Sequence, residues 1–179
     1  MNKRTEIIDG ATRLFEAEGF RGIGIDRLIA PSGISTRTLY KHFGSRNGLV
    51  LAVLAERHRT FMDQLQAQPG SVEALFDTLR AWVREHGTLG CMLLRARSEY
   101  AQASREVVSL VDAQKTEFRN EVAERVKLAL GKNNERLFTQ VWLLFEGATA
   151  GAGVAGASVI DDAKQAALSL IAFAGTDRP

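Results

Sequence analysis

The sequence has few of the residues that build covalent or metal-based scaffolds. Its 179 residues include one cysteine, Cys91, and three histidines. A single cysteine cannot form an intramolecular disulfide, and no cysteine or histidine has a partner at the spacing of a zinc site. We therefore expect a protein of a reducing compartment, the cytoplasm, that uses neither a metal site nor another cofactor.

Long hydrophobic runs are also missing. The longest weakly polar stretch, residues 147–160, is rich in Gly and Ala. It is shorter than the roughly 20 residues that a helix needs to cross a bilayer. No apolar export segment follows the first residues. The sequence therefore predicts no association with a membrane.

Proline is scarce, and no stretch alternates polar residues with Val, Ile or Thr. Only three prolines occur in the chain. Apolar residues instead recur at spacings of three and four, which is typical of helices with one buried face. We expect an all-α fold of about nine helices, and 45% hydrophobic residues are enough for one compact domain or two small ones.

Motifs of catalysis are absent as well. The sequence contains no glycine-rich phosphate loop, no nucleophile elbow and no cysteine–histidine cluster. The paired carboxylates of Asp161 and Asp162 are explained by the preference of acidic residues for a helix start. We therefore expect that the protein is not an enzyme.

What the sequence does contain is a local excess of positive charge. Residues 1–60 carry ten Lys and Arg against six Asp and Glu, whereas residues 61–179 carry thirteen against fifteen. Five basic residues lie between Arg21 and Arg46, and Asp26 is the one acidic residue there. This distribution favours a surface that faces a polyanion, and a merely solvated basic face is the alternative.

Residues 25–41 predict two short helices joined by a glycine turn, the helix-turn-helix arrangement of DNA-binding proteins. Gly33 suits a positive φ at the turn, and Ser35 can cap the second helix. Ile34 and Leu39 would face inward. The predicted DNA-contacting residues are Ser35, Thr36, Arg37, Thr38, Tyr40, Lys41, His42 and Arg46.

Different chemistry is expected from different members of this set. The Arg37 guanidinium can donate to O6 and N7 of one guanine, which discriminates between bases by about 1–3 kcal/mol. Lys41 should add attraction to phosphates that does not depend on sequence. His42 and Arg46 are expected to contact the DNA backbone, and Tyr40 combines a core role with a hydroxyl donor.

The order and spacing of these residues resemble the N-terminal domain of TetR-type transcriptional regulators. The shared pattern covers roughly the first third of the chain and consists of Ala11-x-x-Leu14-Phe15-x-x-x-Gly19-Phe20, Leu28, Gly33-Ile34-Ser35, Thr38-Leu39-Tyr40-x-His42-Phe43 and Ser45-Arg46-x-x-Leu49. The sequence departs from the family at Ile23 and Gly24, where a hydroxyl residue usually caps the second helix and reaches a phosphate. It also departs at Ile29, where alanine is usual.

The resemblance implies a division of the chain and a mechanism. Residues 1–48 would form the DNA-binding domain, and residues 49–179 the helical regulatory and dimerisation domain, connected by a helix at 49–67. A homodimer would place two reading helices about 34 Å apart, on the two arms of an inverted-repeat operator in double-stranded DNA. A small-molecule effector of unknown identity would release this repressor from its operator. The alternatives are a transcriptional activator, or a helical carrier or enzyme that has lost DNA binding.

The C-terminal part supplies two further predicted sites. An effector pocket between helices is expected to be lined by Trp82, Met92, Arg95, Tyr100, Phe118, Phe138 and Trp142. The dimer interface is expected at Gly147, Ala148, Gly151, Ala166 and Leu170. For the segment after Gly153, a flexible loop is the alternative to a helix contact. Cys91 is expected to be a buried, inert thiol, and a redox sensor is the alternative.

Overall fold

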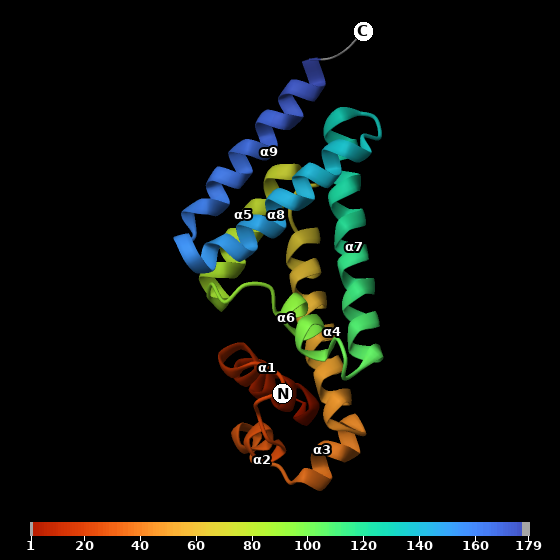
Figure 1. Ribbon diagram of the computed structural model, residues 1–179, viewed down its shortest axis with the longest axis vertical. Helices are drawn as coiled ribbons and strands as arrows, with labels where there is room; N and C mark the ends of the chain where they lie inside the picture. The colour runs from red at the N-terminus through yellow and green to blue at the C-terminus, as the bar shows by residue number, and fades with distance from the viewer. Residues whose placement is uncertain (1, 177–179) are drawn as a thin grey trace. The chain divides into compact units, whose positions relative to one another are not determined.

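A computed structural model describes residues 2–176, and all regular secondary structure in this part of the chain is helical (Figure 1). The helices are α1 (Lys3–Glu18), α2 (Ile25–Ile29), the 3-10 turn η1 (Ala30–Ser32), α3 (Thr36–Phe43), α4 (Arg46–Gln66), α5 (Val72–His86), α6 (Met92–Tyr100), α7 (Arg105–Leu130), α8 (Glu135–Ala155) and α9 (Ser158–Thr176). The predicted all-α fold and the predicted number of helices are confirmed.

Short polar side chains fix where several helices begin. The side chains of Ser35, Ser71 and Asn134 accept hydrogen bonds from the backbone N–H groups of Thr38, Ala74 and Leu137, respectively. Each interaction satisfies one of the N–H groups that the first turn of a helix leaves unpaired. The predicted cap of α3 by Ser35 is therefore confirmed.

The predicted start of the last helix, at Asp161 or Asp162, is wrong. The α9 helix begins at Ser158, directly after Gly156 turns the chain with a φ of 86°. The glycine-rich segment before it stays helical to Ala155. A Cβ on Gly153 would lie 2.5 Å from the carbonyl oxygen of Thr88, so the missing side chain lets this turn of α8 approach another segment closely.

The chain divides into two compact units. Unit 1 comprises residues 1–60 and 92–114, and unit 2 comprises residues 61–91 and 115–179. The core of unit 1 is built around Phe15 and Phe20, whose stacked rings are 4.7 Å apart between centroids. The predicted division after residue 48 is a functional one and stays a prediction; in the structure, α6 and the first part of α7 belong to the same unit as α1–α3.

Unit 2 is held together by apolar packing and by one buried arginine. Helices α8 and α9 pack against each other, and α9 also packs on α5 (Figure 1). Arg125 is buried and donates to the carbonyl oxygens of Leu65, Pro69 and Ser71 and to the Glu121 carboxylate. These bonds satisfy carbonyl groups around the α4–α5 turn. Within residues 2–176 no helix is long and apolar enough to cross a membrane.

Candidate nucleic-acid interface

The α2–η1–α3 segment has the geometry of a helix-turn-helix. Gly33 closes the turn in the left-handed conformation, with φ 59° and ψ 27°, which suits glycine because it has no Cβ. Leu28 of α2 and Leu39 of α3 are both fully buried. The packing of these two side chains anchors α3 on one side and leaves its other side exposed.

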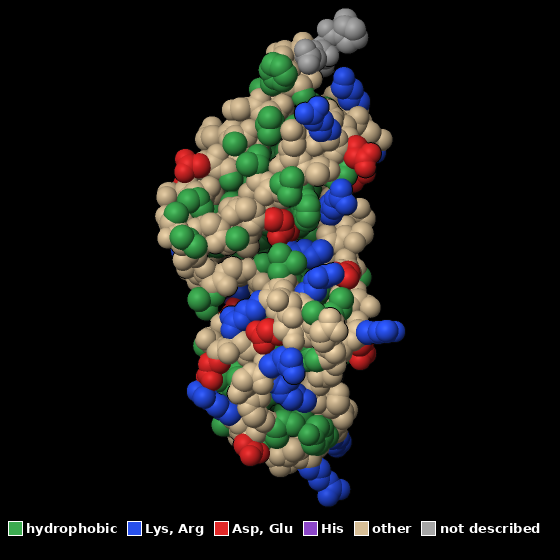
Figure 2. Space-filling model, in the orientation of Figure 1, with side chains coloured by type: hydrophobic (Ala, Val, Ile, Leu, Met, Phe, Trp, Pro, Cys, Tyr) green, Lys and Arg blue, Asp and Glu red, His purple; other side chains and the backbone are tan. Residues whose placement is uncertain are grey.

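The exposed side of α3 carries cations that are not neutralised. Arg37 and Lys41 are exposed, and neither has a carboxylate partner within the described part of the chain. Tyr40 is 44% exposed. Lys and Arg side chains project from the region of α2 and α3 in Figure 2. This side of α3 therefore presents guanidinium, ammonium and phenol donors to solvent.

The remaining residues of the predicted contact set divide into two groups. His42 is exposed and Thr36 is half-buried. The Ser35 hydroxyl caps α3 and lies 3.0 Å from the Thr38 hydroxyl, so these two groups are engaged with each other. Their first role is to fix the start of α3.

Arg46 points into unit 1. Its guanidinium donates to the hydroxyl of Tyr100 at 2.6 Å, to the carbonyl oxygen of Ile23 at 3.2 Å and to that of Phe20. Three donors are therefore already bound to the protein. This geometry gives Arg46 a structural role, and we leave it out of the interface that we propose below.

The start of α2 offers little to a phosphate. Ile23 is 3% exposed and packs into the core of unit 1. Gly24 occupies the N-cap position of α2 without a side-chain hydrogen bond, and Asp26 puts a negative charge in the first turn. Arg27 is paired with Glu18 at 2.6 Å. The departure from the family pattern at residues 23 and 24 thus removes a hydroxyl from this helix start.

Glu99 of α6 holds the loop between α1 and α2. One carboxylate oxygen accepts from the backbone N–H groups of Phe20 and Arg21, at 2.8 and 2.9 Å. The other lies 3.3 Å from the guanidinium of Arg95, which also donates to the carbonyl oxygen of Glu16. This positioning role was not predicted for Glu99. The only local signal was its spacing of four from Arg95 on one helix.

The residues predicted to line an effector pocket lie in different settings. In unit 1, Arg95 and Tyr100 are bound to Glu99 and Arg46, and Met92 is buried. In unit 2, the rings of Trp82 and Phe61 form a T-shaped pair, and Phe118 is buried against Phe145. Phe138 and Trp142 lie under the guanidinium of Arg119. The pocket prediction for these seven residues remains a prediction.

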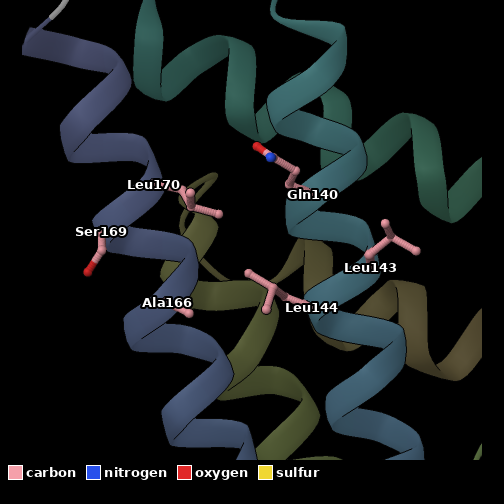
Figure 3. Close-up of a pocket in the computed structure, with 6 residues that line it drawn as sticks. All are labelled: Gln140, Leu143, Leu144, Ala166, Ser169 and Leu170. Carbon is pink, nitrogen blue, oxygen red and sulfur yellow. The ribbon is translucent and has the colours of Figure 1, made fainter.

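A groove of about 550 Å³ lies between α8 and α9 (Figure 3). It is lined by Gln140, Leu143, Leu144, Ala166, Ser169 and Leu170. Leu144 and Leu170 project into the space between the two helices (Figure 3). The groove is almost entirely apolar and open to solvent. None of the residues predicted for the effector pocket lines it.

Two of the five residues predicted for the dimer interface, Ala166 and Leu170, line this groove. Gly147 is exposed, and Gly151 is half-buried beside Val159. Ala148 is only 4% exposed and belongs to the core of unit 2. Its side chain therefore packs α8 against the core of unit 2, and we leave Ala148 out of the interface that we propose.

Cys91 is half-buried, so the expectation of a buried thiol is not met, and its inertness stays a prediction. It neighbours Lys115, whose ammonium lies 2.7 Å from the Glu146 carboxylate. Burial lowers the pKa of Lys115, but the electrostatic and hydrogen-bond interactions of its ammonium with Cys91 and Glu146 outweigh this effect and raise the pKa above its ordinary value of 10.5. Among the described residues, no group of three His, Cys, Asp or Glu is placed to hold a metal ion.

Comparison with known proteins links this geometry to a family. Residues 7–53 match the model of the bacterial regulatory proteins of the tetR family. The transcriptional activator FasR of Mycolicibacterium smegmatis is 32% identical over 104 residues, which are 51% of this chain and 45% of FasR. The transcriptional repressor AcnR of Corynebacterium glutamicum is 35% identical over 74 residues, 41% of this chain and 39% of AcnR. Both matches span less than half of the relative's length.

The fold comparison extends over nearly the whole chain. The crystal structure of a TetR-family transcriptional regulator from Streptomyces coelicolor superposes with a TM-score of 0.87 at 25% identity, covering 97% of this chain and 96% of that one. The fold of this chain is therefore similar to that of a TetR-family regulator also in the part that the family model does not reach.

Proposed function

Because the chain belongs to the tetR family of bacterial regulatory proteins, we propose that it is a transcriptional regulator that binds double-stranded DNA through α3. The observation that carries the proposal is the exposed side of α3, where Arg37 and Lys41 have no carboxylate partner within residues 2–176. The named relatives are regulators and not enzymes, which supports the prediction of a non-enzyme. A role on chromosomal DNA would place the protein in the cytoplasm.

Recognition would divide between bases and phosphates. Arg37 lies in the first turn of α3, the part of a reading helix that enters the major groove most deeply. Its planar fork of donors fits O6 and N7 of guanine. Lys41, one turn further along, suits a phosphate, and the exposed Tyr40 hydroxyl and His42 ring add donors for the DNA backbone. Thr36 offers a methyl group for contact with thymine.

Selection of bound fragments from random duplex DNA tests this proposal. We expect an inverted repeat to be enriched, and Arg37→Ala to weaken binding and relax the preference at one base pair of each arm by about 1–3 kcal/mol. Lys41→Ala should weaken binding to all duplexes alike. Arg84→Ala on α5 is the matched control, because Arg84 is also exposed and lies outside α3. Wild-type protein that binds no duplex at low salt would contradict the proposal.

We propose that a second copy of the chain covers the groove between α8 and α9. Phe173 is 70% exposed on the turn of α9 that follows Leu170, and Leu143 is 55% exposed on α8. Residues 165–176 of α9 contain no charged side chain although half of this helix faces solvent. Exposed apolar surface of this kind marks interaction sites. A two-fold dimer would also supply the second reading helix that an inverted repeat requires.

We propose repression relieved by a small molecule as the mode of action. The ligand would have to favour a dimer geometry that fits DNA poorly, and a switch from mostly bound to mostly released needs about 5 kcal/mol of preference. AcnR is named a repressor and FasR an activator, so the direction of regulation needs its own test. A reporter gene behind the selected operator should be silenced by the protein; stimulation would establish the activator instead. A ligand that is found by thermal shift and leaves operator affinity unchanged would contradict release by effector.

A further inference from the structure

We infer that Arg4, in the first turn of α1, is a further contact to the phosphates of the DNA that α3 reads. The inference rests on the proposed function, since it concerns the same complex. It assigns a role in DNA binding to α1, which lies outside the α2–η1–α3 segment.

The first turn of α1 contacts the segment 32–43, which comprises the turn and α3, at both of its ends. The ammonium of Lys3 donates to the carbonyl oxygen of Ser32, directly before the Gly33 turn, at 3.2 Å. The guanidinium carbon of Arg4 lies 5.3 Å from the centroid of the Phe43 ring, which is the last residue of α3. Of these two neighbouring cations of α1, Lys3 therefore contacts the turn that precedes α3, and Arg4 contacts the last residue of α3.

The two cations differ in whether a carboxylate neutralises their charge. Lys3 is paired with the Glu6 carboxylate at 2.9 Å. Arg4 is exposed and has no carboxylate partner among residues 2–176. A ring face attracts a guanidinium without neutralising it. Phe43 therefore orients Arg4 and leaves both its charge and its fork of donors available for a phosphate.

The rest of unit 1 leaves few other cations beside α3. Arg27 is neutralised by Glu18, and the guanidinium of Arg46 donates to groups within the unit. The start of α2 has lost the hydroxyl that would reach a phosphate, because Ile23 is buried and Gly24 has no side chain. Arg4 thus supplies from α1 a phosphate contact that α2 does not offer.

Arg13 provides a control on the same helix. It lies nine residues after Arg4, which at 3.6 residues per turn places it on the opposite side of α1. Like Arg4, it is exposed and has no carboxylate partner in the described part of the chain. Arg4→Ala and Arg13→Ala therefore remove the same charge from the same helix, and only the first removes it beside α3.

The experiment measures operator affinity against salt concentration for wild type, Arg4→Ala, Arg4→Lys and Arg13→Ala, with a thermal melt of each variant. Each lost phosphate contact lowers the slope of log affinity against log salt by about 0.9. For a dimer with two equivalent contacts, Arg4→Ala should lower the slope by roughly 1.8, so its deficit relative to wild type shrinks about tenfold between 50 and 200 mM salt. Arg4→Lys should retain the slope, and base preference should not change in any of the four.

Two results would overturn the inference while leaving the proposed function intact. One is a slope for Arg4→Ala equal to that of Arg13→Ala. The other is an Arg4→Ala variant that melts earlier and loses base preference at an unchanged slope, because Arg4 would then only support α3 through Phe43. Wild-type protein that binds no duplex would overturn the proposed function first and this inference with it.

Discussion

The carboxylate of Glu99 accepts a hydrogen bond from the backbone N–H of Phe20 at 2.8 Å, across 79 positions of sequence. The same oxygen accepts from Arg21. The loop between α1 and α2 has no regular backbone partners for these two donors, so a side chain from α6 supplies them. Glu99 thereby fixes the loop between α1 and α2, which directly precedes the helix-turn-helix.

Glu99→Ala should destabilise unit 1, because it leaves two backbone N–H groups without an acceptor. Hydrogen bonds to a charged acceptor contribute about 1.5–3 kcal/mol, and we expect a loss of that order in the free energy of unfolding measured with urea. Glu99→Gln keeps one acceptor oxygen and loses the charge, so its loss should be smaller. Equal stability of wild type and Glu99→Ala would show that water replaces the carboxylate without cost.

Local signals in the sequence were sufficient for most helix boundaries. A cap such as Ser35 or Asn134 acts on an N–H group three residues away, and a turn glycine such as Gly33 acts on its own backbone. Both can be read from a few neighbouring residues. The helix-turn-helix and the all-α fold were predictable for this reason.

Side chains with distant partners were not predictable in this way. The basic residue Arg46 fits a phosphate contact by composition, but its partners Phe20 and Tyr100 lie 26 and 54 positions away. Glu99 is similar, since nothing next to it in the sequence indicates Phe20. Residues 147–155 are helical, and Gly153 among them lies close to the backbone of Thr88, a contact that the helix propensities of single residues cannot reveal.

The corner between α3 and α4 depends on Gly48. A Cβ at this position would overlap the backbone carbonyl oxygen of Phe43, and a backbone atom cannot rotate away. Gly48→Ala should therefore cost about 1–3 kcal/mol or more in the free energy of unfolding and weaken DNA binding by displacing the end of α3. Gly22→Ala is the control, because a Cβ at Gly22 would have only an ordinary contact, 4.0 Å from the Glu18 carbonyl oxygen. A Gly48→Ala variant as stable as Gly22→Ala would show that the corner relaxes freely.

Phe173→Arg tests whether a second copy covers the groove between α8 and α9. A charged side chain within an apolar contact would have to be desolvated, so the variant should be monomeric at concentrations where wild type is dimeric. Leu128→Arg is a matched control, since Leu128 on α7 is also 70% exposed and lies away from the groove. Light scattering after size-exclusion chromatography gives the mass of each. Wild type and Phe173→Arg of equal mass would exclude this face as the interface.

The ion pair of Lys115 and Glu146 should make stability depend on pH in the alkaline range. Because the folded-state pKa of Lys115 is raised above its ordinary value of 10.5, folding favours the protonated ammonium. Its contribution is complete below the unfolded-state pKa and is lost as the pH rises through the folded-state pKa. Wild type should therefore lose stability above about pH 10.5 more steeply than Lys115→Met, which has no ammonium to deprotonate.

Thermal melts of both proteins between pH 8 and pH 11.5 measure this difference. All other side chains are the same in the two proteins, so their effects cancel in the comparison. At pH 8 the variant should already be less stable, because the Glu146 carboxylate, which is only 14% exposed, loses its partner. Glu146→Gln removes one of the two groups that raise the pKa, so the fall in its melting temperature above about pH 10.5 should be smaller than that of wild type. Parallel curves for wild type and Lys115→Met up to pH 11.5 would contradict a stabilising role for the ammonium.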